Sequence, residues 1–340
     1  MIAPSRDLVR FEDAVRGCEV DLSDNTNLWG PPPAVQRAAS AFAARDVSRY
    51  PSAFSDDLKQ AIARYTGVDE SCIVTGCGSD DVLDSAIRAF GVAGDGLAQL
   101  DPTFSMIRAF AALNGLSVSG ISTDREDLAA AFVETDARLI YLCSPNNPTG
   151  GVISPDVAEA IVAGSNGIVI IDEAYIDFGG VPSVRLFERY DNVLVTRTFS
   201  KAFGLAGFRV GYGVGAPELI RQVECARGPY KVSAFSERVA IDALENDTEW
   251  VAQRVAEAVA NRERLSRELA ALENPALTSG ANFVLVPVGN AERVEAFMRD
   301  AGVAVRRFDR LPGIGDAVRI TVGPWPLMEK CLDAFRGAVS

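Results

Sequence analysis

The sequence predicts an α/β fold in which a mainly parallel central sheet lies between helices and a smaller α+β unit follows. Through the middle of the chain, short apolar runs rich in Val and Ile alternate with helical patterns, which is typical of a parallel sheet covered by helices. A second alternation of strand and helix patterns occupies the last part of the chain. With 340 residues, 48% of them hydrophobic and 23% charged, the chain has enough apolar surface for one large and one small domain.

The first predicted strand, residues 73–75, leads into a Gly-rich turn and a helix. Amides that begin a helix after such a turn can bind an anion, although the spacing matches neither the dinucleotide fingerprint nor the P-loop. From this turn alone, an ordinary turn and a phosphate site both remain open. The turn is Gly76-Cys77-Gly78-Ser79-Asp80, and the helix carries on one face the apolar residues Val82, Leu83, Ala86, Ile87 and Phe90.

Three further predicted strands, residues 139–143, 168–171 and 193–195, each end in polar residues. Ligands of an open α/β sheet bind beyond the carboxyl ends of its strands, so these polar residues should meet at one site. They are Ser144-Pro145-Asn146-Asn147, Asp172-Glu173 and Thr196-Arg197-Thr198.

The smaller unit begins with a long amphipathic helix predicted over residues 248–271. We therefore expect a large domain over residues 31–247 and a small domain over residues 248–340. The later patterns predict strands at residues 283–288, 303–306 and 318–322, a helix at 291–300 and a closing helix from about residue 327.

Charge and amino-acid usage exclude several classes of function. The 46 acidic residues outnumber the 33 basic ones, and the formal net charge of −13 repels nucleic acid and anionic membranes. The chain has no His, which removes Ser-His-Asp and Cys-His catalysis and His-ligated metals, so no metal site is expected. The six Cys form no CxxC pair, and neither a secretory signal nor a long apolar run is present. We expect a cytoplasmic protein with reduced thiols.

The segment most informative about chemistry is Thr198-Phe199-Ser200-Lys201-Ala202-Phe203-Gly204. A Lys that follows a strand among apolar and small residues is partly desolvated, which lowers its pKa and makes the amine a nucleophile toward aldehydes. Lys201 is therefore a candidate for Schiff-base chemistry. Taken alone, the segment fits a surface Lys at the start of a helix equally well.

Residues after the neighbouring strands favour the Schiff-base alternative. Asp172 at the end of a buried strand is costly unless it pairs with a cation, and the ring nitrogen of pyridoxal 5'-phosphate is such a partner. Asn147 and Tyr175 can hydrogen-bond the phenolate oxygen of this cofactor. Its phosphate can be bound by Thr198, Ser200, Arg209 and the amides after Gly78.

Further motifs follow one another from about residue 25 to the end of the chain. They are Arg49-Tyr50-Pro51, Gly78-Ser79-Asp80-Asp81, Asp101-Pro102-Thr103-Phe104, Ser144-Pro145-Asn146-Asn147-Pro148-Thr149-Gly150, Asp172-Glu173-Ala174-Tyr175, Thr198 to Arg209, and Val318-Arg319-Ile320-Thr321-Val322-Gly323. In this combination and order the chain resembles the fold-type I, pyridoxal-phosphate-dependent aminotransferases of class I/II, which share the aspartate aminotransferase-like fold. It resembles the histidinol-phosphate aminotransferases most closely.

The resemblance implies a role for each matching residue. Lys201 would carry the cofactor as a Schiff base and move the substrate proton, Asp172 would keep the ring nitrogen protonated, and Tyr175 would contact the phenolate oxygen. Phe104 would stack on the ring. Tyr50 would reach the phosphate in the partner subunit, which implies a homodimer with shared active sites. The other cofactor-binding positions would be Gly78, Ser79, Asp80, Asn147, Thr198, Ser200 and Arg209.

The resemblance also implies an N-terminal arm, residues 1–30, over the active site, and positions that bind the substrate. Arg319 and Arg306 match arginines that bind anionic groups of the substrate, and a solvated basic edge is the alternative for Arg306. In the segment Asn25-Thr26-Asn27-Leu28-Trp29-Gly30, the Glu and Pro usual in the family are absent. Trp29 and Gly30 are candidates for the substrate pocket, with core packing the alternative for Trp29.

The leading hypothesis is a homodimeric aminotransferase that moves an amino group from histidinol phosphate to 2-oxoglutarate. An aromatic amino acid is the second candidate donor. A pyridoxal-phosphate-dependent decarboxylase or lyase of the same fold is more remote, because the bond that breaks depends on the orientation of the substrate. A catalytically silent binding protein is not favoured, because Lys201 and Asp172 are both present.

Overall fold

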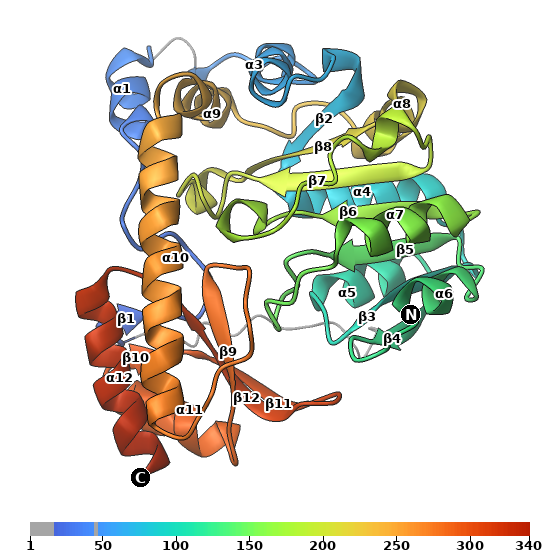
Figure 1. Cartoon of the computed structure of the whole chain (residues 1–340). Helices are drawn as coiled ribbons and strands as arrows, with labels where there is room; N and C mark the ends of the chain where they lie inside the picture. Colours follow the sequence, from blue (N-terminus) through green and yellow to red (C-terminus); the bar gives the residue numbers. More distant parts are fainter. Residues whose placement is uncertain (1–16, 44–46) are drawn as a thin grey trace, which may run out of the picture.

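The computed structural model describes residues 17–43 and 47–340, and Figure 1 shows them as two parts joined by one long helix. The larger part is built on a seven-stranded sheet, and the smaller part holds a three-stranded antiparallel sheet. The predicted fold class is confirmed: a mostly parallel central sheet with helices precedes a smaller α+β unit.

The large sheet has the strand order β2-β8-β7-β6-β5-β3-β4. Strands β7, β6, β5, β3 and β4 run parallel, and β8 is antiparallel to both of its neighbours. The parallel strands therefore direct their carboxyl ends to one edge of the sheet. The strands are β2 (Ile73–Cys77), β3 (Gly96–Asp101), β4 (Ser117–Ser122), β5 (Leu139–Cys143), β6 (Ile168–Asp172), β7 (Val193–Thr198) and β8 (Val210–Gly215).

Both faces of the sheet are buried, because its central strands carry apolar side chains on both sides. Tyr141 and Ile170 belong to the core on one face, and Leu142 and Ile171 to the core on the other. The first face is covered by α4 (Ser79–Phe90), α5 (Met106–Leu113) and α8 (Pro217–Arg227), and the second by α6 (Leu128–Val133) and α7 (Pro155–Gly164).

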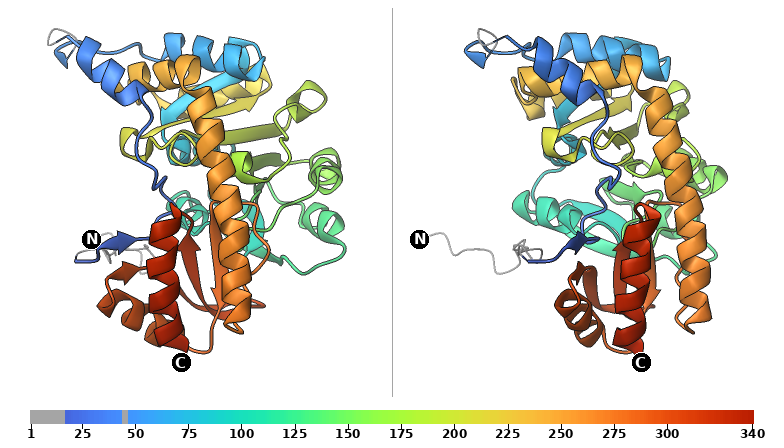
Figure 2. Two further views of the ribbon diagram at one scale, coloured as in Figure 1. Left: turned by 60° about the vertical axis from the view of Figure 1, so that its left-hand side comes forward. Right: turned by 90° about the vertical axis from the view of Figure 1, so that its left-hand side faces the viewer.

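A third group of helices closes the end of the larger part that lies away from the smaller part (Figure 2). It consists of α1 (Ala34–Ala41), α3 (Asp56–Thr66) and α9 (Ala234–Asn246). Leu58 of α3 and Val239 of α9 share a core with Phe199 and Phe203, which lie in the loop after β7. Single turns of 3-10 helix complete this part: η1 (Glu70–Cys72), η2 (Ile176–Phe178), η3 (Leu186–Glu188) and η4 (Ala206–Phe208).

The smaller part has an antiparallel sheet of order β11-β12-β9, with a separate parallel pair of β1 and β10. The prediction of one strand over residues 303–306 is wrong, because the chain there forms two strands. They are β10, which pairs with β1, and β11, which pairs with β12. The elements are β1 (Val20–Asp21), β9 (Phe283–Pro287), α11 (Ala291–Asp300), β10 (Val303–Ala304), β11 (Arg306–Leu311), β12 (Gly315–Thr321) and α12 (Trp325–Val339).

Helix α10 (Thr248–Ala271) connects the two parts. Its first half buries Val251 and Ala258 in the core shared with α3 and α9, and its second half buries Leu265 and Leu269 in the core of the smaller part. Between them, Arg262 donates hydrogen bonds to the carbonyl oxygens of Phe178 (3.0 Å) and Ala281 (2.9 Å). One helix thus fixes the smaller sheet relative to the larger one.

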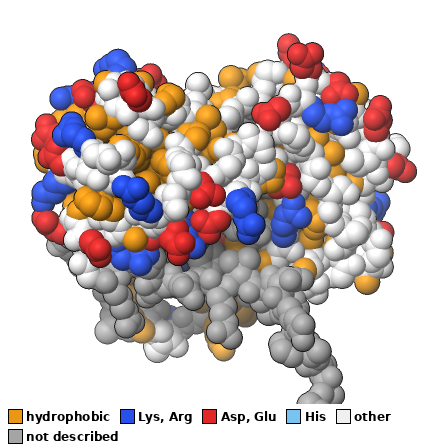
Figure 3. Space-filling view, turned by 90° about the horizontal axis from the view of Figure 1, so that it is seen from below, with side chains coloured by type: hydrophobic (Ala, Val, Ile, Leu, Met, Phe, Trp, Pro, Cys, Tyr) orange, Lys and Arg blue, Asp and Glu red, His pale blue; other side chains and the backbone are white. Residues whose placement is uncertain are grey.

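Residues 1–16 of the predicted N-terminal arm lie outside the described residues. The following segment pairs through β1 with β10 and continues to α1. On the face seen from below, acidic and basic side chains are interspersed (Figure 3). None of the helices described here is both long and apolar enough to cross a lipid bilayer.

Candidate active site

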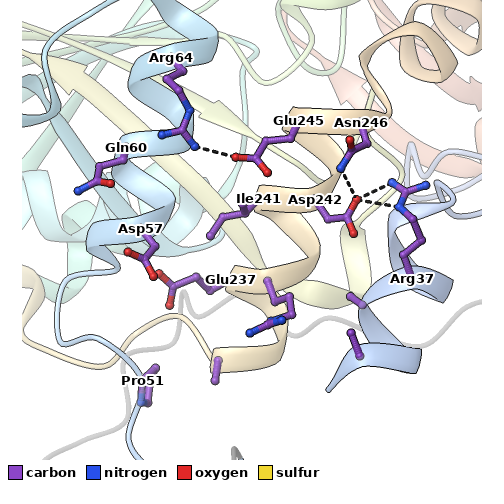
Figure 4. Close-up of a pocket in the computed structure, with 14 residues that line it drawn as sticks. Arg37, Pro51, Asp57, Gln60, Arg64, Glu237, Ile241, Asp242, Glu245 and Asn246 are labelled. Carbon is purple, nitrogen blue, oxygen red and sulfur yellow. Dashed lines mark hydrogen bonds and ion pairs between the residues drawn. The ribbon is translucent and has the colours of Figure 1, made fainter. Parts of the chain in front are cut away.

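A cavity of about 560 Å³ lies between α1, α3 and α9 (Figure 4). Two of the three arginines that line it pair with carboxylates in its own walls: Arg37 donates to Asp242 at 2.5 Å, and Arg64 donates to Glu245 at 2.7 Å. Among the described residues that line it there is no Lys, Cys, Ser or Thr. Its described walls therefore offer no amine, thiol or aliphatic hydroxyl as a nucleophile.

A second cavity, of about 610 Å³, lies at the carboxyl edge of the large sheet and is bounded on its other side by β11 and β12. The structure brings together here Asn147, Asp172 and Thr198, one residue from each predicted polar cluster, as the fold predicts. The prediction is wrong for Glu173 and Arg197 of the same clusters, which do not line this cavity and form an ion pair with each other at 2.8 Å. The predicted site residues that line it are Ser79, Asp80, Phe104, Asn147, Asp172, Tyr175, Thr198, Ser200, Lys201, Arg209, Arg306 and Arg319.

Lys201 is held in the cavity wall by the buried residues that flank it. Phe199 and Ala202 are 1% exposed and Phe203 is 5% exposed, and all three belong to the core under α3 and α9. The backbone of this loop is thereby anchored, and the Lys201 Nζ donates a hydrogen bond to the carbonyl oxygen of Asp24 at 3.0 Å.

The surroundings of the Lys201 amine favour its neutral form. Burial, followed by the positive charge of Arg319, lowers the pKa of Lys201 from its usual value to about 8. The Nζ also lies 5.7 Å from the centroid of the Tyr175 ring. A Lys with this pKa is partly unprotonated near neutral pH, as a nucleophilic amine must be.

Asp172 presents a buried carboxylate to the same cavity. Its Oδ2 accepts a hydrogen bond from the Tyr141 hydroxyl at 2.8 Å, and its Oδ1 accepts from the Thr196 hydroxyl at 3.1 Å and the Ala174 amide at 3.2 Å. Burial raises the pKa of Asp172 to about 6, and the two hydroxyl donors oppose that rise. The carboxylate is therefore mostly ionised at neutral pH and can receive a cationic N–H.

Tyr175, at the end of the β6 segment, is joined to the N-terminal segment. Its hydroxyl accepts a hydrogen bond from the Asn25 Nδ2 at 2.9 Å, and the Asn25 Oδ1 accepts from the Thr321 hydroxyl at 3.2 Å. Burial raises the pKa of Tyr175, so the phenol keeps its proton at neutral pH. The phenol can therefore donate to an oxygen in the cavity.

Arg319 of β12 and Asn147 meet across the cavity. The Arg319 Nη1 donates to the Asn147 Oδ1 at 2.6 Å, and its Nη2 donates to the carbonyl oxygen of Ser23 at 2.5 Å. The Nε is buried and has no hydrogen-bond partner among the described residues. Because its Oδ1 is occupied, Asn147 can offer its amide Nδ2 to a ligand, and Arg319 still has donor capacity.

The opposite end of the cavity is built for an anion. Helix α4 begins with Ser79, and Arg209 lies beside this N-terminus, with its Nη2 3.3 Å from the Asp80 Oδ2 and its Nη1 3.5 Å from the Ser200 Oγ. The hydroxyl of Thr198 accepts from the Ser200 amide at 3.1 Å. A helix N-terminus, a guanidinium and hydroxyls in one place bind phosphate well.

Gly78 itself does not line the cavity but is required by its geometry. Its φ is +79°, and a Cβ at this position would lie 2.6 Å from the Arg209 Nη2. Glycine allows the chain to turn into α4 while the guanidinium lies directly against it.

Apolar and basic side chains form the remaining walls. Phe104, Phe110 and Phe308 line the cavity together with Arg306 of β11. Arg306 and Arg319 are direct cross-strand partners on the antiparallel strands β11 and β12. Like charges in directly opposite positions repel, so an anion beside them would be stabilising.

Besides Gly78, three predicted site residues do not line the cavity. Tyr50 is 83% exposed and contacts Tyr230, with 4.8 Å between ring centroids. Trp29 packs against the core under α3 and α9, which is the alternative that the sequence left open for it. Gly30 lies beside the loop that carries Lys201. Its carbonyl oxygen is so close to Gly204 of this loop that a Cβ added to Gly204 would lie 3.1 Å from it.

Sequence reasoning missed Tyr141 and Asn25, and it placed Thr196 among the polar residues after a strand without giving it a role. Tyr141 and Thr196 lie inside strands, and strand register is the signal that could have revealed their contact with Asp172. Thr196 and Cys143 lie directly opposite Asp172 on the two neighbouring strands. Tyr141 precedes Cys143 by two residues and so lies on the same face of the sheet. Asn25 comes from a distant segment, and its contact with Tyr175 has no local signal.

Residues 19–335 match the model of the family "Aminotransferase class I and II". The histidinol-phosphate aminotransferase of Synechocystis sp. is 36% identical over 310 residues, which cover 89% of this chain and 87% of the relative. That of Caldanaerobacter subterraneus is 33% identical over 301 residues, covering 86% and 85%. The crystal structure of histidinol-phosphate aminotransferase from Sinorhizobium meliloti in complex with pyridoxal-5'-phosphate has a TM-score of 0.86 at 26% identity and covers 98% of both chains.

Proposed function

Because the chain belongs to the class I and II aminotransferases, we propose that it is a pyridoxal-phosphate-dependent aminotransferase whose amino donor is histidinol phosphate and whose acceptor is 2-oxoglutarate. The observation that carries this proposal is one cavity in which a Lys amine of lowered pKa, a buried carboxylate, an anion-binding helix end and two arginines all meet. Each has a chemical counterpart in the cofactor or the substrate.

The residues present fit the cofactor. Asp172 has room in its hydrogen-bonding shell for a ring N–H, while Tyr175 and Asn147 can donate to the phenolate oxygen. Arg209, Ser200, Thr198 and the N-terminus of α4 would hold the phosphate, and Phe104 offers a ring face. When bound, pyridoxal phosphate supplies an aldehyde for amines and a ring that accepts electrons from the substrate Cα.

The chain's own residues supply binding, orientation and proton transfer. The Lys201 amine is the nucleophile, and once released it is the base that takes and returns the substrate proton; its pKa of about 8 suits both tasks at neutral pH. Asp172, with its pKa near 6, holds a negative charge at the ring nitrogen. The Asn25–Tyr175 and Asn147–Arg319 hydrogen bonds fix the donors around the phenolate oxygen.

The donor is proposed from the arginine pair and the aromatic wall. Histidinol phosphate carries a phosphate, which suits the opposed Arg306 and Arg319, and an imidazole ring, which suits Phe308 and Phe110. The sequence similarity to histidinol-phosphate aminotransferases supports the same donor.

We further propose a homodimer in the cytoplasm, with Tyr50 completing the phosphate site of the partner subunit. Tyr50 is 83% exposed and its ring contacts the ring of Tyr230, so most of the side chain is available to a second copy. All six cysteines lie in the described residues and none forms a disulfide, which suits a reducing compartment. In this dimer, residues 31–247 and 248–340 would act as the two domains that enclose the substrate, with residues 1–30 as the arm.

The test is a panel of amino donors mixed with protein loaded with pyridoxal phosphate. We expect histidinol phosphate to change the visible absorbance of the bound cofactor fastest, with 2-oxoglutarate restoring it. A faster response to phenylalanine or tyrosine would replace the donor but keep the reaction class. Release of CO₂, or no spectral response to any donor, would contradict an aminotransferase.

A further inference from the structure

The Asp172 carboxylate is held by neutral donors alone. Asp172 is 3% exposed, and it forms no ion pair within the described residues. Its three hydrogen bonds come from the hydroxyls of Tyr141 and Thr196 and from the Ala174 amide. A carboxylate buried in this way stays ionised only as far as these donors compensate its lost hydration.

Tyr141 is placed for this contact by strand register. Cys143 of β5 lies opposite Asp172 of β6, and Tyr141 precedes Cys143 by two residues on the same face of the sheet. The Tyr141 ring is fully buried in the core against α4 and α5, so it cannot swing away. Its single hydroxyl proton points to the Asp172 Oδ2, 2.8 Å away. Because that oxygen accepts no other hydrogen bond from the described residues, Tyr141 is its protein partner.

Other titratable groups close to Asp172 include one like charge and groups that stay neutral. Asp80 at the start of α4 raises the pKa of Asp172 through its like charge. Burial raises the pKa of Cys143, of Tyr141 and of Tyr175, so these three groups stay neutral around neutral pH. Thr196 from β7 acts on the other carboxylate oxygen.

We propose that Tyr141 is a positioning residue that keeps Asp172 ionised and aimed at the ring nitrogen of the cofactor. The proposal rests on the proposed function for the identity of the cofactor. The chain has no His, so no imidazole can donate to this carboxylate, and a phenol does so instead.

The test compares Tyr141→Phe with a matched control, Tyr212→Phe. Phe keeps the ring and removes only the donor. Tyr212 is also a buried Tyr of the same sheet, on β8, but its hydroxyl bonds Arg197 and not Asp172. Loss of a buried hydroxyl as such therefore affects both variants, and loss of the Asp172 contact affects only one.

The first readout needs no cofactor. Protein labelled with ¹³C at the Asp carboxyl carbon is titrated by NMR, and the Asp172 signal is identified by its absence in Asp172→Asn. We expect Tyr141→Phe to raise the pKa of Asp172 by roughly one to two units, as loss of a charge-assisted hydrogen bond does. Tyr212→Phe should leave this pKa unchanged. An equal pKa in the Tyr141 variant and the parent protein would overturn the proposal.

The second readout uses the protein loaded with pyridoxal phosphate labelled with ¹⁵N in the ring. A more basic Asp172 draws the shared proton away from the ring nitrogen, so the ¹⁵N signal of Tyr141→Phe should move toward that of neutral pyridine. We also expect kcat to fall by about 10-fold with KM nearly unchanged. An unmoved ¹⁵N signal would contradict the positioning role.

The two readouts separate the two proposals. If the carboxyl titration shifts but no protein form binds pyridoxal phosphate, the proposed function fails and the Tyr141–Asp172 contact stands. If Tyr141→Phe does not fold, Thr196→Val removes the other hydroxyl donor, and the same titration should show a smaller rise in the Asp172 pKa. No rise in that variant would contradict control of this carboxylate by neutral hydroxyls.

Discussion

Replacing Gly78 with Ala tests the anion end of the cavity, and Gly228 provides a closely matched control. The backbone angles are nearly identical, φ +79° and ψ 169° at Gly78 against φ +74° and ψ 173° at Gly228. This region is open almost only to glycine, so each Ala should cost about 1–3 kcal/mol of stability. The two sites differ in their surroundings: a Cβ at Gly228 meets nothing within 4 Å, whereas one at Gly78 lies 2.6 Å from the Arg209 Nη2.

The magnitude for cofactor binding follows from what Arg209 has to do. Its guanidinium is the mobile end of a flexible side chain, so it swings away from the new methyl group and from the α4 N-terminus. Loss of one charge-assisted hydrogen bond to the phosphate costs about 1.5–3 kcal/mol, or roughly a 10- to 150-fold higher Kd for pyridoxal phosphate.

The assay is a fluorescence titration of apo protein with pyridoxal phosphate, with thermal unfolding measured alongside. Both variants should unfold at similarly reduced temperatures, and only Gly78→Ala should bind the cofactor weakly. A Kd for Gly78→Ala equal to that of the parent protein, or an equally weakened Gly228→Ala, would refute the assignment of Arg209 to the phosphate.

Three further predictions concern single side chains. The pKa of Lys201 is lowered from 10.5 to about 8, so between these pH values the unfolded chain binds more protons than the folded one, and folding stability rises with pH. Lys201→Met removes this group and should therefore be more stable than the parent protein in urea unfolding at pH 7, by a margin that shrinks toward pH 10. The same variant should lack the visible absorbance of the loaded protein. Arg319→Lys keeps the charge but cannot bond Asn147 and Ser23 together, so KM for the anionic donor should rise by roughly 10-fold or more in steady-state kinetics, and an unchanged KM would remove Arg319 from the substrate site. Tyr50→Ala should leave the unfolding temperature nearly unchanged, because the side chain is 83% exposed. It should nevertheless weaken cofactor binding at protein concentrations where light scattering shows a dimer. Cofactor binding as tight as in the parent protein would contradict a shared site.

Local pattern was sufficient for most of the fold. Helix α10 begins at Thr248 and ends at Ala271, as its amphipathic pattern predicts, and β5 to β7 begin at their predicted residues because both faces of these strands are buried. The single strand predicted over residues 303–306 instead divides around Val305. The division arises because β10 pairs with β1, a two-residue strand near the other end of the sequence. Such a long-range pairing leaves no periodic signal.

The candidate site was predictable where it follows the strand ends. Asn147, Asp172 and Lys201 lie in the cavity because parallel strands bring their carboxyl ends together. Tyr141 could not be found in this way, because it lies within a strand and its apolar ring fits a core position equally well. Asn25 depends on the path of the N-terminal segment, which only the packed structure fixes.

The measurement that tests the account most directly is reduction of the loaded protein with borohydride, followed by peptide mapping in a mass spectrometer. The chain has four lysines, Lys59, Lys201, Lys231 and Lys330, so the three others serve as internal controls. We predict one pyridoxyl group per chain, on Lys201, and its loss when histidinol phosphate is added before reduction. A stable label on Lys59, Lys231 or Lys330 instead, or no label on Lys201, would contradict the account.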